Sequence, residues 1–180
     1  MKEKEFRAEF DRIALPHLDA AYNLARWLTR HDQDAEDVVQ EAYLRAYRFF
    51  GSFHGEAGRA WLLQIVRNTC HTWLARNRPS GGGSAPAQVL VDLPGPESNP
   101  HVALERSEDR QQLMQAVAGL PVEFREVIVL RELEDMSYKE IARIAGVPLG
   151  TVMSRLARGR ERLHGILERK GAGEGSDGMP

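Results

Sequence analysis

The sequence contains a single cysteine, Cys70, and no run of 18 consecutive apolar residues among its 180 positions. One thiol cannot form an intrachain disulfide and, without cysteine companions, does not build a zinc site. Cys70 is therefore expected to be a small core residue. The missing apolar run excludes a transmembrane helix, and the charged N-terminal stretch MKEKEFRAEF excludes a signal peptide. We therefore expect a cytoplasmic protein that inserts no segment of its own into a membrane.

The sequence also lacks the motifs on which enzymes depend. The six histidines are scattered, and paired carboxylates, metal-ligand spacings, nucleophile motifs and phosphate-binding loops are missing. We therefore expect neither catalysis nor a metal or other cofactor. Alternation typical of strands is missing as well, and apolar residues recur at three- and four-residue spacing, which predicts an all-α fold.

The sequence does show a strongly uneven distribution of charge. The formal net charge is −2, yet residues 51–80 carry a net +3 and residues 137–170 a net +5. Between them, residues 81–136 carry a net −6. Two basic segments separated by an acidic one indicate two separate contacts with a polyanion such as nucleic acid.

Glycine, proline and serine are concentrated between residues 78 and 100, where helical periodicity is lost. This composition predicts a flexible linker between two small helical domains. The expected division is a first domain at 1–78, a linker at 79–100, a second domain at 101–170 and a disordered tail at 171–180. Helices are expected at about 6–29, 34–50 and 60–76 in the first domain, and at 102–118 and 122–133 in the second.

The clearest local motif is a helix-turn-helix at residues 137–162. Ser137, followed three residues later by Glu140, forms a capping box that starts the first helix. Gly146 supplies the left-handed conformation that ends it, and the small Ala142 lets the second helix cross closely. On the second helix, Val152, Leu156 and Leu163 are expected to face inward and the arginines to face outward.

In such a motif, side chains near the start of the second helix reach base edges, and later arginines pair with phosphates. We expect the first helix to contact DNA through Lys139. On the second helix, Thr151, Ser154 and Arg155 are expected to contact bases. Arg158 and Arg160 are expected to contact phosphates, and Arg162 also projects outward. The alternative is an amphipathic helical hairpin with a solvated basic face. The specific spacing of small residue, glycine and valine favours DNA binding.

The helix expected at residues 34–50 has two unlike faces. One face is apolar and includes Val39 and Tyr43, flanked by Phe49. The opposite stripe has the same helical spacing and is polar except for one leucine; it consists of Asp37, Gln40, Glu41, Leu44 and Arg48. Taken alone, this stripe indicates a solvated face rather than an interface.

Residues 51–78 combine a glycine-containing loop with a helix in which aromatic, polar and basic side chains alternate. Trp61 and Trp73 are expected in the core rather than as platforms for base stacking. The polar and basic residues that lie mostly off the core stripe are Arg67, Asn68, His71, Arg76 and Arg78. A glycine-rich loop beside such a helix also offers what the binding of unpaired bases requires.

Together these segments resemble the bacterial sigma factors of the extracytoplasmic-function (ECF) group of the sigma-70 family. The promoter-opening domain of that family is similar to DAEDVVQEAYLRAYRFF followed by WLLQIVRNTCHTWLARNRP. Its second domain, which recognises the upstream element, is similar to LPVEFREVIVLRELEDMSYKEIARIAGVPLGTVMSRLARGRERL. The resemblance covers residues 34–78 and 120–164 well, but neither the linker nor the tail. The glycine within residues 56–59 departs from the bulkier residue that members often have.

The resemblance implies partners for several of these residues. The stripe Asp37, Gln40, Glu41 and Leu44 falls where the family docks on the β′ clamp helices of core RNA polymerase. Residues 52–59 correspond to the loop that surrounds an extruded base of the −10 element. The implied −10 contacts are Ser52, Phe53, His54, Arg67, Asn68, His71 and Arg76. The helix at 149–160 falls on the segment that recognises the −35 element, and an anti-sigma factor is implied as a further partner.

The main hypothesis is an alternative sigma factor, a dissociable subunit that directs core RNA polymerase to one promoter class. A second hypothesis is a sigma-like decoy that sequesters an anti-sigma factor; such a decoy is expected to lose the basic helix and Asn68, and this sequence keeps both. A third is a one-component regulator that binds operators as a dimer, but no ligand or receiver domain is evident.

Overall fold

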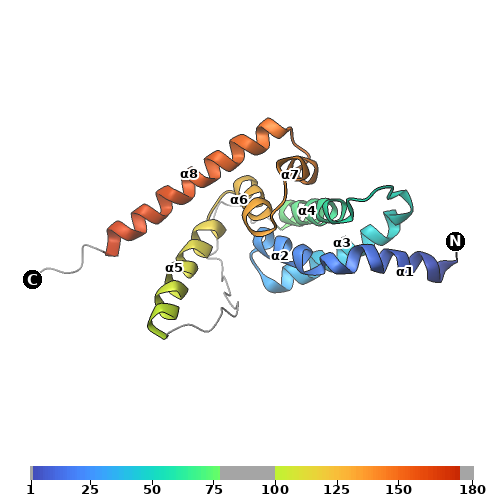
Figure 1. Ribbon diagram of the computed structural model, residues 1–180, viewed down its shortest axis with the longest axis horizontal. Coiled ribbons are helices and arrows are strands. Elements are labelled where there is room, and N and C mark those ends of the chain that lie inside the picture. The colour runs from blue at the N-terminus through green and yellow to red at the C-terminus, as the bar shows by residue number, and fades with distance from the viewer. Residues whose placement is uncertain (1, 78–99, 175–180) are drawn as a thin grey trace, which may run out of the picture.

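The computed structural model describes residues 2–77 and 100–174, without the side chains of residues 100–106 and 174. Within these ranges the chain is helical and contains no strand (Figure 1), which confirms the all-α prediction. The expected linker lies outside the described residues except for its last position, Pro100, which begins a helix.

The first lobe is built from four α-helices and two short 3-10 turns. The helices are α1 (Glu3–Ala14), α2 (Leu18–Thr29), α3 (Asp32–Phe49) and α4 (Gly58–Arg76). The single helix predicted over residues 6–29 is wrong, because a 3-10 turn at Leu15–His17 separates α1 from α2. Pro16 lies in this turn, and proline has no N–H to continue the hydrogen-bond pattern of an α-helix.

The second lobe contains α5 (Pro100–Ala118), α6 (Val122–Ile128), α7 (Tyr138–Ala145) and α8 (Leu149–Glu174). In place of the single helix predicted over residues 122–133, α6 is followed by a π-helical segment at Val129–Leu133. Helix α8 continues through residues 171–174, which were predicted to belong to the disordered tail. Extending an existing helix costs less than starting one, so α8 continues through the small residues of this segment.

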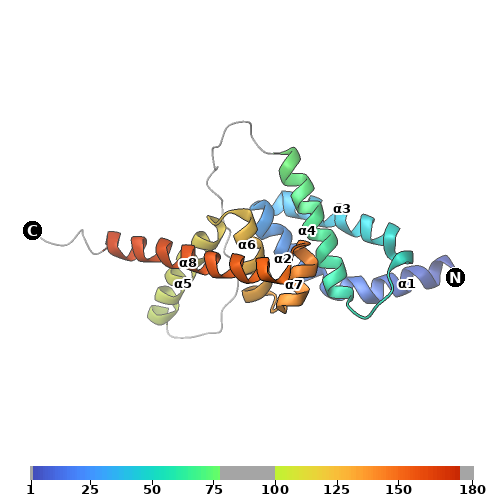
Figure 2. The ribbon, with the colours of Figure 1, turned by 90° about the horizontal axis from the view of Figure 1, so that it is seen from above.

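The two lobes pack directly on each other, which the predicted flexible linker did not indicate. Helix α2 contacts α6 and helix α4 contacts α7, and both views show these pairs at the centre of the molecule (Figures 1 and 2). Helices α1 and α8 extend away from this centre in opposite directions (Figure 1). Buried apolar residues of both lobes form one cluster, so the hydrophobic core crosses the boundary between the lobes.

Cys70 lies in this core, as predicted. Its side chain is completely buried, and burial raises the pKa of the thiol to about 12. The neutral thiol therefore behaves as a small apolar group. No helix within residues 2–77 and 100–174 has the length and apolar content needed to cross a membrane.

Two glycines lie where helices approach too closely for a side chain. A Cβ atom at Gly58 would lie 2.8 Å from Cγ2 of Ile13, on α1. A Cβ atom at Gly159 would lie 3.0 Å from Cγ1 of Ile128, on α6. Gly58 therefore allows the start of α4 to pack on α1, and Gly159 allows α8 to pack on α6.

We predict that Gly58→Ala lowers the free energy of unfolding by about 1–2 kcal/mol, because the added methyl group overpacks the contact with a stiff, β-branched isoleucine. The matched control is Gly165→Ala on α8, where no atom lies within 4 Å of the added Cβ. The control is expected to gain about 0.5–1 kcal/mol from helix propensity. Urea unfolding followed by circular dichroism measures both values, and a Gly58→Ala protein as stable as the control would contradict the close contact.

Candidate nucleic-acid interface

The predicted helix-turn-helix is formed by α7, a short turn and the start of α8. The backbone N–H of Glu140 donates to Oγ of Ser137 at 3.2 Å, and the N–H of Ser137 donates to Oε2 of Glu140 at 2.7 Å. Gly146 ends α7 with φ at 67° and donates its N–H to the carbonyl of Ala142. These contacts confirm the predicted capping box and the predicted left-handed glycine.

The rotation of α8 about its axis is fixed by its buried side. Val152 and Leu156 are 0% and 1% exposed, and Gly159 faces α6. The opposite side of α8 therefore faces solvent. Of the six predicted −35 contacts, four are exposed and two, Thr151 and Arg155, are half-buried; the exposed ones are Lys139, Ser154, Arg158 and Arg160.

Two arginines of α8 have partners within the protein. Arg160 donates from Nη2 to Oε1 of Glu132 at 2.7 Å, and hydrogen bonds to Glu132 and Tyr138 raise the pKa of Arg160. The guanidinium of Arg162 lies over the ring of Phe124, 4.9 Å from its centre. Arg162 is exposed, as expected, but this cation–π contact ties it to α6 instead of leaving it free to face DNA.

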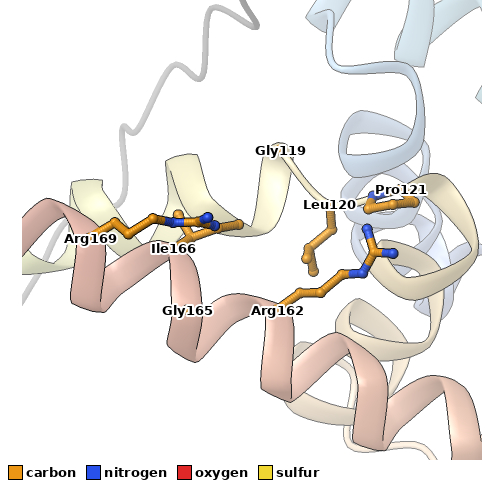
Figure 3. A pocket seen from close by; sticks show the side chains of 7 residues that line it. All are labelled: Gly119, Leu120, Pro121, Arg162, Gly165, Ile166 and Arg169. Atoms are coloured by element: carbon orange, nitrogen blue, oxygen red, sulfur yellow. The ribbon is translucent and has the colours of Figure 1, made fainter.

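Arg162 also lines a groove between α8 and the turn that joins α5 to α6. Figure 3 shows Arg162 and Arg169 on α8 beside the turn that contains Leu120 and Pro121. The groove has a volume of about 290 Å³. It lies beyond the first turns of α8, which carry the predicted base contacts.

The loop before α4 presents one aromatic and two polar side chains among the predicted −10 contacts. Phe53 is half-buried, with its ring centre 4.7 Å from that of Trp61. Ser52 and His54 are exposed, and Oγ of Ser52 donates to the carbonyl of Phe49 at 2.7 Å. Trp61 thus packs within an aromatic cluster, in agreement with its predicted core role.

The predicted −10 contacts on α4 fall into two groups. Asn68 and Arg76 are exposed, and Oδ1 of Asn68 accepts a hydrogen bond from Nη1 of Arg67 at 3.3 Å. Arg67 and His71 are half-buried and both bind Glu126 of the second lobe. Asn68 is therefore accessible to solvent, whereas Arg67 and His71 are bound to Glu126.

The polar stripe on α3 is exposed as the helical spacing predicted. Asp37, Gln40, Glu41 and Leu44 all face solvent, and Leu44 exposes 57% of its surface. Oε1 of Glu41 accepts from Nε of Arg45 at 2.8 Å.

Gln40 and Leu44 also line a groove of about 610 Å³, together with residues of α1 such as Phe10. Phe49, which was placed beside the buried face of α3, is instead 61% exposed at the end of the helix. The α3 surface therefore combines an acidic edge with exposed apolar groups, which suits a protein partner better than a purely solvated face.

Comparisons with known proteins match both lobes. The family described as Sigma-70 region 2 matches residues 13–79, and the family described as Sigma-70, region 4 matches residues 110–163. The chain is 33% identical to the RNA polymerase sigma-H factor of Pseudomonas aeruginosa, over 88% of this chain and 86% of that relative. It is 39% identical to the ECF RNA polymerase sigma-E factor of Escherichia coli, over 72% of each. The chain belongs to the ECF group of the sigma-70 family.

Another relative of this sigma factor is the ECF RNA polymerase sigma factor SigE of Mycolicibacterium smegmatis, at 34% identity over 88% of this chain. The chain spans 61% of the length of that relative. Among solved structures, the sigma factor RpoE in complex with the anti-sigma factor NepR from Bartonella quintana aligns with a TM-score of 0.70 at 27% identity, over 89% of this chain and 97% of that one. CnrH in complex with the cytosolic domain of CnrY aligns with a TM-score of 0.63 at 26% identity, over 91% and 90%.

Sequence reasoning missed the polar contacts that join the two lobes of this sigma factor. Glu126, on α6, is completely buried, and its carboxylate binds Arg67 through both oxygens and His71 at 3.1 Å. Burial alone would raise the pKa of Glu126, but hydrogen bonds from His71 and Arg67 lower it below its usual value. The carboxylate is therefore charged, with both partners supplied by the first lobe.

A second acidic residue makes a similar contact. Oε1 of Glu134 accepts from Nδ2 of Asn23 at 2.6 Å. Nη2 of Arg59 donates to both the carboxylate and the backbone carbonyl of Glu134 at 2.9 Å. Glu134 is 9% exposed, so this contact is also largely removed from water.

Arg125 provides a third contact. Its Nη1 donates to the carbonyls of Ala118 and Leu120, and its Nη2 donates to the carbonyl of Leu28 in the first lobe at 3.3 Å. Burial, followed by the nearby charge of Arg30, lowers the pKa of Arg125 to about 10, so it remains protonated at neutral pH. The sequence did hold a signal: Arg125 and Glu126 lie between Phe124 and the apolar run at residues 127–130, and charged residues within such a run are rarely buried unless they are paired.

Proposed function

We propose that this sigma factor binds core RNA polymerase in the cytoplasm and directs it to one class of promoter, without making or breaking a covalent bond itself. The solvent-facing start of α8 would recognise the −35 element. Helix α4 and the loop before it would recognise and help to open the −10 element. The observation that carries the proposal is the helix-turn-helix, whose cap, glycine turn and buried side leave Ser154 and Arg158 of α8 facing solvent.

The proposed polymerase contact is the exposed stripe on α3. Leu44 supplies an apolar centre, and Asp37 and Glu41 supply negative charge beside it. Such a surface suits a partner that is basic and partly apolar, and the family docks this surface on the β′ clamp helices.

An anti-sigma factor is a further proposed partner. The relatives RpoE and CnrH were solved with the anti-sigma factor NepR and with the cytosolic domain of CnrY, respectively. The decoy alternative is less favoured, because the sequence retains Asn68 and the predicted base contacts of α8, and Asn68 and Ser154 are exposed. In vitro transcription separates the two: the purified chain added to core polymerase should give promoter-specific transcripts, whereas a decoy gives none.

We predict that Glu41→Lys weakens assembly with core RNA polymerase by at least about tenfold, because it reverses a charge in the docking stripe. The change is on an exposed position and should leave the thermal unfolding midpoint nearly unchanged. The matched control is Glu108→Lys, an exposed glutamate of α5 in the other lobe. Fluorescence anisotropy with labelled protein and core polymerase measures the affinity, and equal affinities for the two variants would refute docking through the stripe.

We predict that Asn68→Ala reduces open-complex formation about tenfold, while closed-complex binding falls less than about twofold, because an extruded base exists only in the open complex. Permanganate reactivity of promoter thymines reports opening, and footprinting at low temperature reports closed-complex binding. Gln33→Ala, an exposed amide on α3, is the control. Equal losses at both stages would argue against a base contact by Asn68.

A further inference from the structure

Three apolar side chains on α8 form a row that the proposed −35 contacts leave unexplained. Leu149, Met153 and Ala157 follow one another at four-residue spacing, so they lie along one side of the helix. All three are exposed, and Leu149 and Met153 expose 42% and 53% of their surface. Single exposed apolar residues are ordinary, but a row of three beside predicted base contacts defines a surface, here called the apolar strip.

The buried side of α8 determines where this strip lies. Because Val152 and Leu156 point into the core, Ser154 lies near the middle of the solvent-facing side. Helical geometry places the apolar strip on one flank of Ser154 and the half-buried Arg155 on the other. Between residues 149 and 157, the outward surface of the helix is thus divided lengthwise into an apolar flank and a cationic one; the apolar strip ends before Arg160, which binds Glu132.

The apolar group that a base edge presents in the major groove is the C5-methyl of thymine. We propose that the apolar strip recognises thymine methyl groups along one side of the −35 element, with Met153 as the central contact. The proposal rests on the proposed −35 role of α8. It is favoured over a protein partner because the strip begins at the N-terminal end of the second helix, which is the end that contacts bases in this motif.

The test replaces each thymine of the −35 element with uracil, which removes the methyl group and preserves every hydrogen bond. The promoter is one mapped from transcripts induced by overexpression, and binding is measured with the holoenzyme assembled on core polymerase. For the wild type we expect one or more substitutions to weaken binding about fourfold, the effect of one methyl group removed from an apolar contact.

Met153→Ala supplies the decisive comparison. The variant should bind the thymine promoter about fourfold or more weakly and should no longer distinguish uracil from thymine at the contacted position. Leu113→Ala removes a similarly exposed apolar side chain from α5, 45% exposed against 53% for Met153, and should keep the wild-type response.

Any of three results overturns the inference. The wild type is insensitive to uracil at every position, the −35 element contains no thymine, or the Met153→Ala holoenzyme still distinguishes uracil from thymine. Loss of core assembly by Met153→Ala, without a methyl effect, assigns the strip to a protein partner and also overturns it. A holoenzyme that fails to protect any −35 element overturns the proposed function itself.

A separate observation concerns the contact between the lobes. Arg67 and His71, two of the proposed −10 contacts, both bind the buried carboxylate of Glu126. Carboxylates and DNA phosphates are both anions that accept charge-assisted hydrogen bonds from a guanidinium. The same side-chain atoms cannot serve Glu126 and DNA at once.

We infer that Glu126 holds the free sigma factor in a closed state by occupying basic side chains that DNA would otherwise use. Glu134 supports this state through Asn23 and Arg59, which lie outside the proposed −10 contacts. The alignments with RpoE–NepR and CnrH–CnrY span 89% and 91% of this chain, so they include both lobes. This inference rests on the proposed −10 role of α4.

The test measures binding of the full chain, without polymerase, to a labelled single-stranded oligonucleotide that carries the −10 sequence. The apparent affinity of a protein with a closed state is reduced in proportion to the fraction that is open. Glu126→Gln should therefore bind the oligonucleotide about fivefold or more tightly and should show a larger radius of gyration by small-angle X-ray scattering. Glu123→Gln, an exposed glutamate on the same helix, should behave as the wild type.

Glu134→Gln keeps the inference falsifiable if Glu126→Gln fails to fold, because it loosens the contact between Glu134 and Arg59 without changing any of the proposed −10 contacts. It should also bind the oligonucleotide more tightly. Folded variants that bind as the wild type does, or more weakly, overturn the closed state. Proteins that all bind a scrambled oligonucleotide equally well overturn the proposed −10 role instead.

Discussion

The arrangement of the two lobes depends on the burial of one charged carboxylate. Glu126 is completely buried, and an ionised group removed from water requires compensating charge and hydrogen bonds. Arg67 supplies the charge, Arg67 and His71 supply the hydrogen bonds, and both residues belong to the other lobe. Separating the lobes would hydrate all three groups together, whereas removing one of them from the closed protein would leave the others buried without their partner.

Around this contact, the two proposed DNA-binding surfaces are in different states. The start of α8 faces solvent, and its geometry is fixed by its own lobe through Val152 and Leu156. Helix α4 instead shares its side chains between solvent, where Asn68 lies, and the second lobe, where Arg67 and His71 lie. The proposed −35 surface is therefore preformed, whereas the proposed −10 surface would be complete only if the lobes separate.

Local features of the fold were predictable from the sequence because they depend on neighbouring residues. The capping box at Ser137 and the turn at Gly146 follow from hydrogen bonds over three or four residues. The exposed stripe of α3 follows from helical periodicity. The break at Pro16 was equally local and was missed, although proline in a helix interior removes a hydrogen bond. What sequence reasoning could not supply was the packing of α4 on α7, because no periodicity encodes contacts between lobes separated by a linker.

The charge distribution nevertheless carried part of that information. The basic segments were interpreted as two contacts with a polyanion, and the acidic segment between them was left without a partner. Glu126 and Glu134 belong to that acidic segment, and they bind Arg67 and Arg59 of the first basic segment. Through Glu126, the acidic segment thus supplies an intramolecular anion for Arg67, which is one of the proposed −10 contacts. A basic segment need not be available to DNA at all times when the same protein carries an acidic segment that binds it. A carboxylate and a DNA phosphate cannot accept hydrogen bonds from the same guanidinium atoms at once.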